Sequence, residues 1–193
     1  MTQSLTLAAH LRESAAIIAR VAEMPAAAQA ERAAGAIAGA LRAGKPLLVC
    51  GNGGSASDAM HITGELVGRF LKERKGYRCI CLASNGAVMT SLSNDYGYDT
   101  VFARQVEAYG ETGGVLWGLS TSGNSPNVVA AFDKARALGM TTLAMTGEGG
   151  GKLAALADIL VDAPSRHTPY IQQAHLCLYH YICEAVEREL TAA

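Results

Sequence analysis

The sequence has little of what marks several large classes of protein. Only 17% of its 193 residues are charged, the formal net charge is −1 and no basic run occurs, which argues against a nucleic-acid partner. No apolar stretch is long enough to cross a bilayer, and the N-terminus lacks the basic and apolar regions of a signal peptide. We therefore expect a cytoplasmic protein that binds neither nucleic acid nor membrane.

Cysteine-pairing motifs are also absent. The cysteines are five, an odd number, and they form no CxxC pair. All of them lie in apolar surroundings, where reduced core thiols are the usual state. They are Cys50, Cys79, Cys81, Cys177 and Cys183. Reduced thiols fit a cytosolic enzyme.

The chain has an apolar composition and a regular alternation of elements. Half of the residues are hydrophobic, which suggests surface buried between subunits. Two helices, Leu5–Met24 and Ala26–Arg42, precede the first strand, and we assign residues 1–44 to packing or subunit contacts. Five strands then alternate with helices, which predicts a single domain over residues 1–193 with a parallel sheet and helices on both faces. The strands are expected at residues 47–50, 77–82, 115–119, 141–146 and 158–161.

The first strand leads directly into a glycine-rich loop. Gly51, Gly53 and Gly54 allow a sharp turn and a close approach to a ligand, and Ser55 is expected to cap a helix that runs from residue 56 to about 70. The free N–H groups at such a helix start favour an anion. His61 and Glu65 share a face of this helix. The pattern predicts a phosphate site beside a titratable pair; the alternative is a plain connection with a surface His–Glu pair.

A second loop follows the third strand and is rich in hydroxyl groups. Ser120-Thr-Ser-Gly-Asn-Ser-Pro-Asn127 places Ser125 at an N-cap and Pro126 at the first helical position. Hydroxyls and helix N–H groups form a neutral phosphate cup. The loop has no lysine, so it is not a P-loop, and the first loop does not match GxGxxG. A phosphate monoester that is held modestly and then released suits this chemistry.

The last helix, expected from residue 170 to about 190, carries Gln172, His175 and His180. Gln172 and His180 lie about 80° apart on the helical wheel, whereas the two histidines lie about 140° apart and cannot easily serve one centre. By itself, His180 among apolar neighbours fits a core histidine better than a catalyst. We expect His10 and His167 at the surface.

Four separated motifs together resemble a known family. The runs CGNGGSASDAMHITGE, NDYGY, STSGNSPN and TPYIQQAHLCLYH occur in the order found in the phosphoheptose isomerases of the sugar isomerase (SIS) domain family, across nearly the whole chain. This resemblance implies a flavodoxin-like, three-layer α/β fold with a five-stranded parallel sheet, and a homotetramer with active sites at subunit interfaces. It also implies an aldose–ketose isomerase that converts sedoheptulose 7-phosphate to D-glycero-D-manno-heptose 7-phosphate through an enediol, towards lipopolysaccharide heptose.

The resemblance assigns roles by position. Glu65 and His180 would be the acid/base pair. The phosphate would be held by Ser120, Thr121, Ser122 and Ser125. The sugar would be lined by Asn52, Gly53, Gly54, Ser55, Glu65, Asn94, Asp95 and Gln172. One zinc ion per subunit would be bound by His61, Glu65, Gln172 and His180. One departure is Pro169, where some members carry aspartate.

Two other functions compete with the isomerase. A non-catalytic SIS-domain protein that binds a phosphosugar or a replication-initiator partner would share the loops but tends to lack the acid on the first site helix, which is present here as Glu65. A zinc hydrolase built on His61 and Glu65 would lack the HExxH arrangement and would leave the phosphate loops unexplained.

Overall fold

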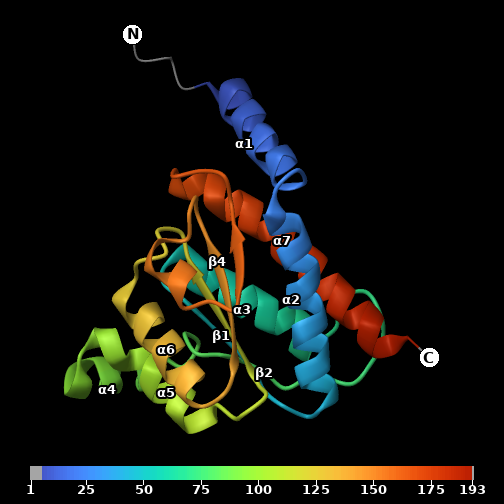
Figure 1. Cartoon of the computed structure of the whole chain (residues 1–193). Helices are drawn as coiled ribbons and strands as arrows, with labels where there is room; N and C mark the ends of the chain where they lie inside the picture. The colour runs from blue at the N-terminus through green and yellow to red at the C-terminus, as the bar shows by residue number, and fades with distance from the viewer. Residues whose placement is uncertain (1–5, 193) are drawn as a thin grey trace.

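A parallel five-stranded sheet forms the centre of the computed structural model, which describes residues 6–192 (Figure 1). The strand order is β2-β1-β3-β4-β5, and every neighbouring pair is parallel. This is the flavodoxin-like order, so the predicted fold class is confirmed. The strands are β1 (Leu47–Gly51), β2 (Cys79–Cys81), β3 (Val115–Ser120), β4 (Thr141–Thr146) and β5 (Ile159–Asp162).

Helices connect the strands and extend the chain at both ends. The α-helices are α1 (Leu7–Val21), α2 (Pro25–Arg42), α3 (Gly54–Val67), α4 (Gly86–Tyr96), α5 (Val101–Tyr109), α6 (Pro126–Ala137) and α7 (Thr168–Thr191). Two short 3-10 helices are η1 (Tyr98–Thr100) and η2 (Gly151–Ala155). The first expected helix began at Leu5, which lies outside the described residues.

One helix is longer than expected. The sequence predicted a short helix over residues 87–92 and a turn at 94–97, but α4 continues to Tyr96 and includes Asn94 and Asp95. The turn prediction was wrong because Asn94 and Asp95, although typical of turns, are tolerated in the last turn of a helix. The Thr90 and Ser93 hydroxyls donate to carbonyls one turn earlier. Gly97, with φ of 84°, then ends the helix.

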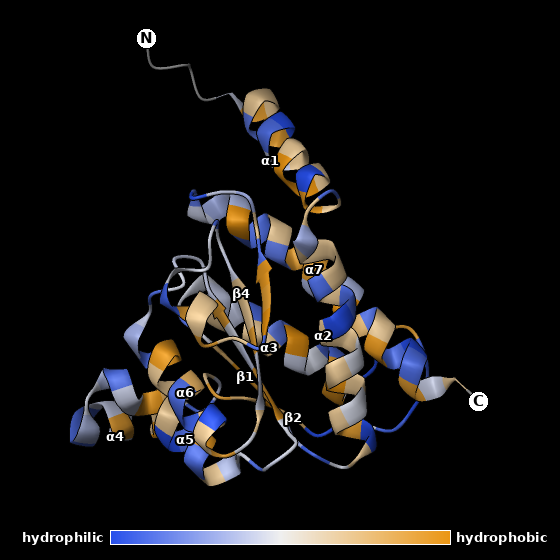
Figure 2. Cartoon of the chain, viewed as in Figure 1, coloured by the Kyte–Doolittle hydropathy of each residue, from blue (hydrophilic) through white to orange (hydrophobic). Residues whose placement is uncertain are grey.

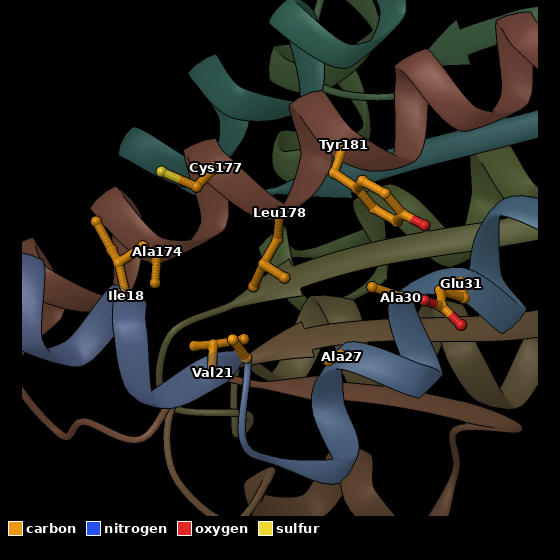
Figure 3. A pocket seen from close by; sticks show the side chains of 10 residues that line it. Ile18, Val21, Ala27, Ala30, Glu31, Ala174, Cys177, Leu178 and Tyr181 are labelled. Carbon is orange, nitrogen blue, oxygen red and sulfur yellow. The ribbon is translucent and has the colours of Figure 1, made fainter.

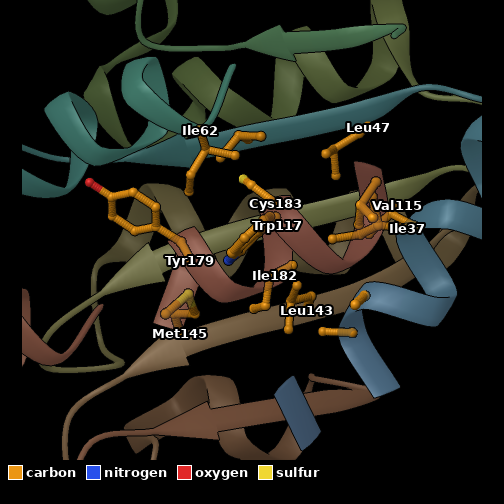
Figure 4. Packing of buried hydrophobic residues seen from close by; sticks show 14 of the residues in the cluster. Ile37, Leu47, Ile62, Val115, Trp117, Leu143, Met145, Tyr179, Ile182 and Cys183 are labelled. Atoms are coloured by element: carbon orange, nitrogen blue, oxygen red, sulfur yellow. The ribbon is translucent and has the colours of Figure 1, made fainter. Parts of the chain in front are cut away.

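Alternate residues of each strand face different helical layers. Leu47 and Val49 point to the face covered by α2, α3 and α7, whereas Leu48 and Cys50 point to the face covered by α5 and α6. The larger core cluster lies on the first face, where Trp117 packs with side chains from the sheet and from three helices (Figure 4). Burial on both faces explains why the strands are almost continuously apolar.

The two N-terminal helices differ in their contacts. Helix α2 packs along α7 and β5, whereas α1 projects from the body of the molecule and touches the start of α7 (Figure 1). Mixed apolar and polar residues cover α1 (Figure 2), and Leu7 and Leu11 are 74% and 57% exposed. His10, expected at the surface, is half-buried because its ring packs 4.9 Å from the ring of Tyr170. His167 is exposed, as expected.

The cysteines do not all belong to the core. All five are free thiols, and four are buried, but Cys177 is exposed on α7. The prediction of a core thiol was wrong for Cys177 because this side of α7 faces a groove beside α1 and α2 instead of the sheet. Within residues 6–192, every helix is too short or too polar to span a bilayer.

Candidate active site

Both predicted ligand loops lie at the point where the strand order reverses. Strands β1 and β3 are adjacent, and the chain leaves β1 towards β2 on one side and leaves β3 towards β4 on the other. Parallel sheets of this kind bind ligands beyond the carboxyl ends of such strands. The loops are joined here: the side-chain amides of Asn52 and Asn127 exchange two hydrogen bonds of 2.9 Å.

The first loop starts α3 earlier than expected. Gly53, with φ of 56°, is the N-cap, and Ser55 is already in the first turn and only 4% exposed. The predicted cap at Ser55 was wrong because the backbone conformation of Gly53 admits the helix two residues sooner. A side chain at position 54 would collide with the amide of Gln172, so Gly54 allows Gln172 to lie directly over the loop.

The second loop has the predicted hydroxyl cup. Ser125 is the N-cap of α6, and its hydroxyl shares a 2.9 Å hydrogen bond with that of Ser120. The Ser122 hydroxyl accepts from the Asn124 backbone N–H at 3.1 Å, and the Thr121 hydroxyl lies 3.5 Å from that of Thr168. At the start of α6, Pro126 has no N–H and the Val128 N–H donates to the Ser125 carbonyl at 3.1 Å, which leaves the Asn127 N–H as the first-turn donor at this edge. The loop can therefore bind an anion through neutral donors.

Helices α3 and α7 bring together residues that are far apart in the chain. Gln172 lies over Gly54, the Tyr179 hydroxyl contacts His61, and Glu187 binds the N–H group of Phe70. Contacts advance along both helices in the same direction, so the helices run parallel and side by side. This pairing places the imidazole of His180 beside the helix that carries Glu65.

Three predicted site residues form one cluster. His61 Nε2 lies 2.9 Å from Glu65 Oε1 and 3.4 Å from His180 Nε2, and one ligand atom of each residue lies within 4.8 Å of the others. His180 is half-exposed, whereas His175 is fully buried with Nε2 at 3.0 Å from the Thr146 carbonyl. The local interpretation of His180 as a core histidine was wrong, because the five-residue offset turns His175 into the core instead.

The cluster fits a zinc ion by its geometry. Two tetrahedral ligands about 2.05 Å from zinc stand about 3.3 Å apart, close to the 3.4 Å between the two imidazole Nε2 atoms. The donors, two imidazoles and one carboxylate, are those of catalytic zinc sites, which keep a fourth position open. Gln172, the fourth predicted ligand, lies two turns earlier on α7 with its amide over Gly54.

The predicted sugar-binding pair of α4 is exposed. The Asn94 amide donates to the Asp95 carboxylate at 2.8 Å near the end of the helix. Three residues later, the Tyr98 hydroxyl donates to Asn52 Oδ1 at 2.9 Å. Sequence analysis missed Tyr98 and Asn127 as partners of Asn52, although both lie within the motifs that carried the resemblance. Nothing in their local spacing reveals a contact between three separate segments.

A buried ion pair holds α3 and α7 together beyond the cluster. The Glu187 carboxylate is 1% exposed and accepts from the N–H groups of Phe70, Leu71 and Lys72 and from Arg74 Nε. Although burial acts to raise the pKa of Glu187, these donors lower it below its usual value. Arg74 in turn donates to the backbone carbonyl of Glu65 at 2.7 Å. The pair therefore fixes the end of α3 that carries Glu65.

Comparisons with known proteins agree with this fold. The SIS domain family model matches residues 9–147. The phosphoheptose isomerase of Crocosphaera subtropica is 52% identical over 84% of this chain and 83% of its own length, and that of Bradyrhizobium sp. strain BTAi1 is 49% identical over 95% and 93%.

Two solved structures of phosphoheptose isomerases have the same fold as this chain. The phosphoheptose isomerase structure from Neisseria gonorrhoeae superposes with a TM-score of 0.89 at 36% identity, covering 94% of this chain and 96% of that one. The structure from Francisella tularensis has the same TM-score at 34% identity. The chain therefore belongs to the SIS domain family and, within it, to the phosphoheptose isomerases.

Proposed function

We propose that this chain converts sedoheptulose 7-phosphate to D-glycero-D-manno-heptose 7-phosphate, with Glu65 and His180 as the acid/base pair. The convergence of His61, Glu65 and His180 beside two anion-binding loops carries this proposal. The cluster lies two turns, about 10 Å, along α3 from Gly54. A substrate with its phosphate at one end and its reacting carbons at the other suits that separation.

The hydroxyl cup suits the phosphate. Ser120, Thr121, Ser122 and Ser125 offer hydroxyl donors, and the start of α6 adds the backbone N–H of Asn127 and a positive dipole end. Because the loop holds no basic side chain, it binds the phosphate without the strong ion pair that would slow product release. Asn52, held by Asn127 and Tyr98, would orient a sugar hydroxyl at the edge of the cup.

The chemistry needs one group to move a carbon proton and another to move a hydroxyl proton. Conversion of a ketose to an aldose transfers hydrogen between C1 and C2 through an enediol. Glu65 would take the proton from carbon, and His180 would exchange the proton between the neighbouring oxygens. Both side chains are accessible to a ligand, because neither is fully buried.

Solvent exchange tests the assignment of Glu65. In deuterated buffer, the wild-type protein should incorporate deuterium at C1 or C2 of the sugar phosphate, and Glu65→Gln should lose this exchange. Undiminished exchange in Glu65→Gln would refute Glu65 as the carbon base. The same assay separates the isomerase from a binding protein, since a non-catalytic SIS-domain protein would form no aldose.

The proposal includes a zinc ion held by His61, Glu65 and His180, with Gln172 as the fourth ligand. When bound, zinc would polarise a substrate oxygen next to the reacting carbons. The ligand atoms of the three clustered residues support this site. Zinc content measured after purification in metal-free buffer, with one ion per chain expected, tests it.

We further propose a cytoplasmic homotetramer with active sites at subunit interfaces. An apolar groove of about 280 Å³ lies between α1, α2 and α7, lined by residues that include Ile18, Ala174 and Leu178 (Figure 3). The exposed leucines of α1 add apolar surface that would be covered in an oligomer. Light scattering should show a tetramer that Leu11→Glu weakens and Arg12→Gln leaves intact.

The cytoplasmic location is proposed from the cysteines. Five free thiols fit a reducing compartment.

A further inference from the structure

The buried Tyr179 contacts the imidazole of His61 at Nδ1, the ring nitrogen that does not face Glu65 and His180. The Tyr179 hydroxyl lies 2.8 Å from His61 Nδ1, and the two rings meet edge to face at 5.3 Å. Tyr179 is only 1% exposed, with its ring in the core between the sheet and α3 (Figure 4). Because the core holds the ring, the hydroxyl has little freedom to move away from His61.

A buried carboxylate oxygen without a donor lies next to this contact. Asp58, one turn before His61 on α3, has a buried Oδ2 atom with no hydrogen-bond partner among residues 6–192. Burial raises the pKa of Asp58, and the adjacent His61 and the Tyr179 hydroxyl act in the opposite direction. Burial, followed by the charge of Asp58, raises the pKa of Tyr179. Asp58 lies one turn before His61 on the same face of α3, and the Tyr179 hydroxyl contacts that face, so the carboxylate, the phenol and the imidazole are neighbours.

The single hydrogen of the Tyr179 hydroxyl limits what this arrangement can do. A tyrosine hydroxyl has one hydrogen, so it can donate to His61 Nδ1 or to Asp58, but not to both. While Tyr179 donates to Nδ1, the neutral His61 carries its proton on Nε2, which then points at Glu65. If the proton sits on Nδ1 instead, the Tyr179 oxygen accepts a hydrogen bond from Nδ1–H, and the Tyr179 hydroxyl donates its own hydrogen to the unpaired Asp58 oxygen. Nε2 then carries a lone pair towards Glu65 and His180.

We propose that Tyr179 and Asp58 are positioning residues that hold His61 in the form whose Nε2 binds a divalent metal ion. This inference rests on the zinc site of the proposed function. It uses the general requirement that a metal-bound histidine donates its other N–H to a fixed acceptor. The free oxygen of Asp58 is then the acceptor that completes the chain of hydrogen bonds.

Zinc affinity of the whole protein, measured by chelator competition, tests the inference. Tyr179→Phe keeps the buried ring and removes only the hydroxyl, and should weaken zinc binding by about 10–100-fold. Asp58→Asn should weaken it less, because its amide oxygen can still accept. Tyr181→Phe, on the exposed side of the same helix, should bind zinc like the wild type. Thermal melting of the zinc-free proteins checks that each variant is folded.

The outcomes separate this inference from the proposed reaction. Zinc affinity within threefold of wild type in a folded Tyr179→Phe protein overturns the inference, as does a wild-type protein that isomerises the sugar phosphate but binds no zinc. A wild-type protein that forms no aldose but whose zinc affinity falls in Tyr179→Phe supports the inference and counts against the reaction. If Tyr179→Phe does not fold, retention of wild-type zinc affinity by Asp58→Ala overturns the inference.

Discussion

The hydroxyl loop and the His61–Glu65–His180 cluster are built in opposite ways. Ser120 to Ser125 lie within one short segment, and their positions follow from the end of β3 and the start of α6. The cluster joins α3 to α7, whose facing residues are more than one hundred positions apart. A local site depends on its own backbone, whereas a site between helices depends on everything that aligns them. Variants that disturb only one of these regions should therefore behave differently.

Removal of the imidazole from the cluster should have the largest effect. His180→Asn is expected to lower kcat by about 10²–10⁴-fold, because no other group at that position can exchange the hydroxyl proton. Binding of the sugar phosphate, measured by calorimetry, should change far less, since the hydroxyl loop is intact. A variant with kcat near the wild-type value would show that the cluster does not carry the chemistry.

The second largest effect is expected from removal of the buried Glu187 carboxylate. Glu187→Ala leaves Arg74 and three N–H groups buried without their acceptor, and should lower the free energy of unfolding by about 3–5 kcal/mol. Urea unfolding measures this change. The control is Glu189→Ala, whose ion pair with Arg42 is exposed, and which should cost less than about 1 kcal/mol. An equal loss of stability in the two variants would contradict a special role for the buried Glu187–Arg74 pair between α3 and α7.

A fall in pH should lower the free energy of unfolding through His175 on α7. Burial lowers the pKa of this histidine from 6.5 to about 4 in the folded chain, so the unfolded chain binds its proton first as the pH falls. The contribution of neutral His175 to the free energy of unfolding is therefore full above pH 6.5. It is lost as the pH falls from 6.5 to about 4, a change of about 3 kcal/mol.

Unfolding measured across this pH range tests the role of His175. The His175→Gln protein should lose less stability over the range than the wild type does. His167→Gln, at an exposed position, is the control and should keep the wild-type pH dependence. Identical curves for His175→Gln and the wild type would assign the acid sensitivity to other groups.

The smallest effect is expected in the hydroxyl loop. Ser125→Ala removes one hydroxyl of several and should raise KM by about tenfold, corresponding to one hydrogen bond of about 1–1.5 kcal/mol. The kcat value should be nearly unchanged, because the cluster is undisturbed. Ser91→Ala on the exposed face of α4 is a matched control with no expected change. A fall in kcat without a change in KM would mean that the two regions are coupled.

Much of this arrangement could be predicted from the sequence. Mostly apolar runs of four to six residues between helical patterns predicted all five strands and the parallel sheet, because strands that are buried on both faces are almost continuously apolar. The glycine and serine loops were placed correctly at the strand ends, because their chemistry is local. The boundaries were less accurate where the backbone angle of one glycine decides, as at Gly53 and at Gly97.

Only the tertiary structure decided which distant side chains meet. Local spacing favoured a core role for His180, and packing of α7 reversed this by burying His175 instead. The contacts of Tyr98 with Asn52 and of Tyr179 with His61 join segments that no periodicity connects. Sequence patterns determine which face of an element is buried, because that follows from its own residues. The partner of that face depends on how the whole chain packs. The geometry of the candidate site is therefore set by the tertiary structure.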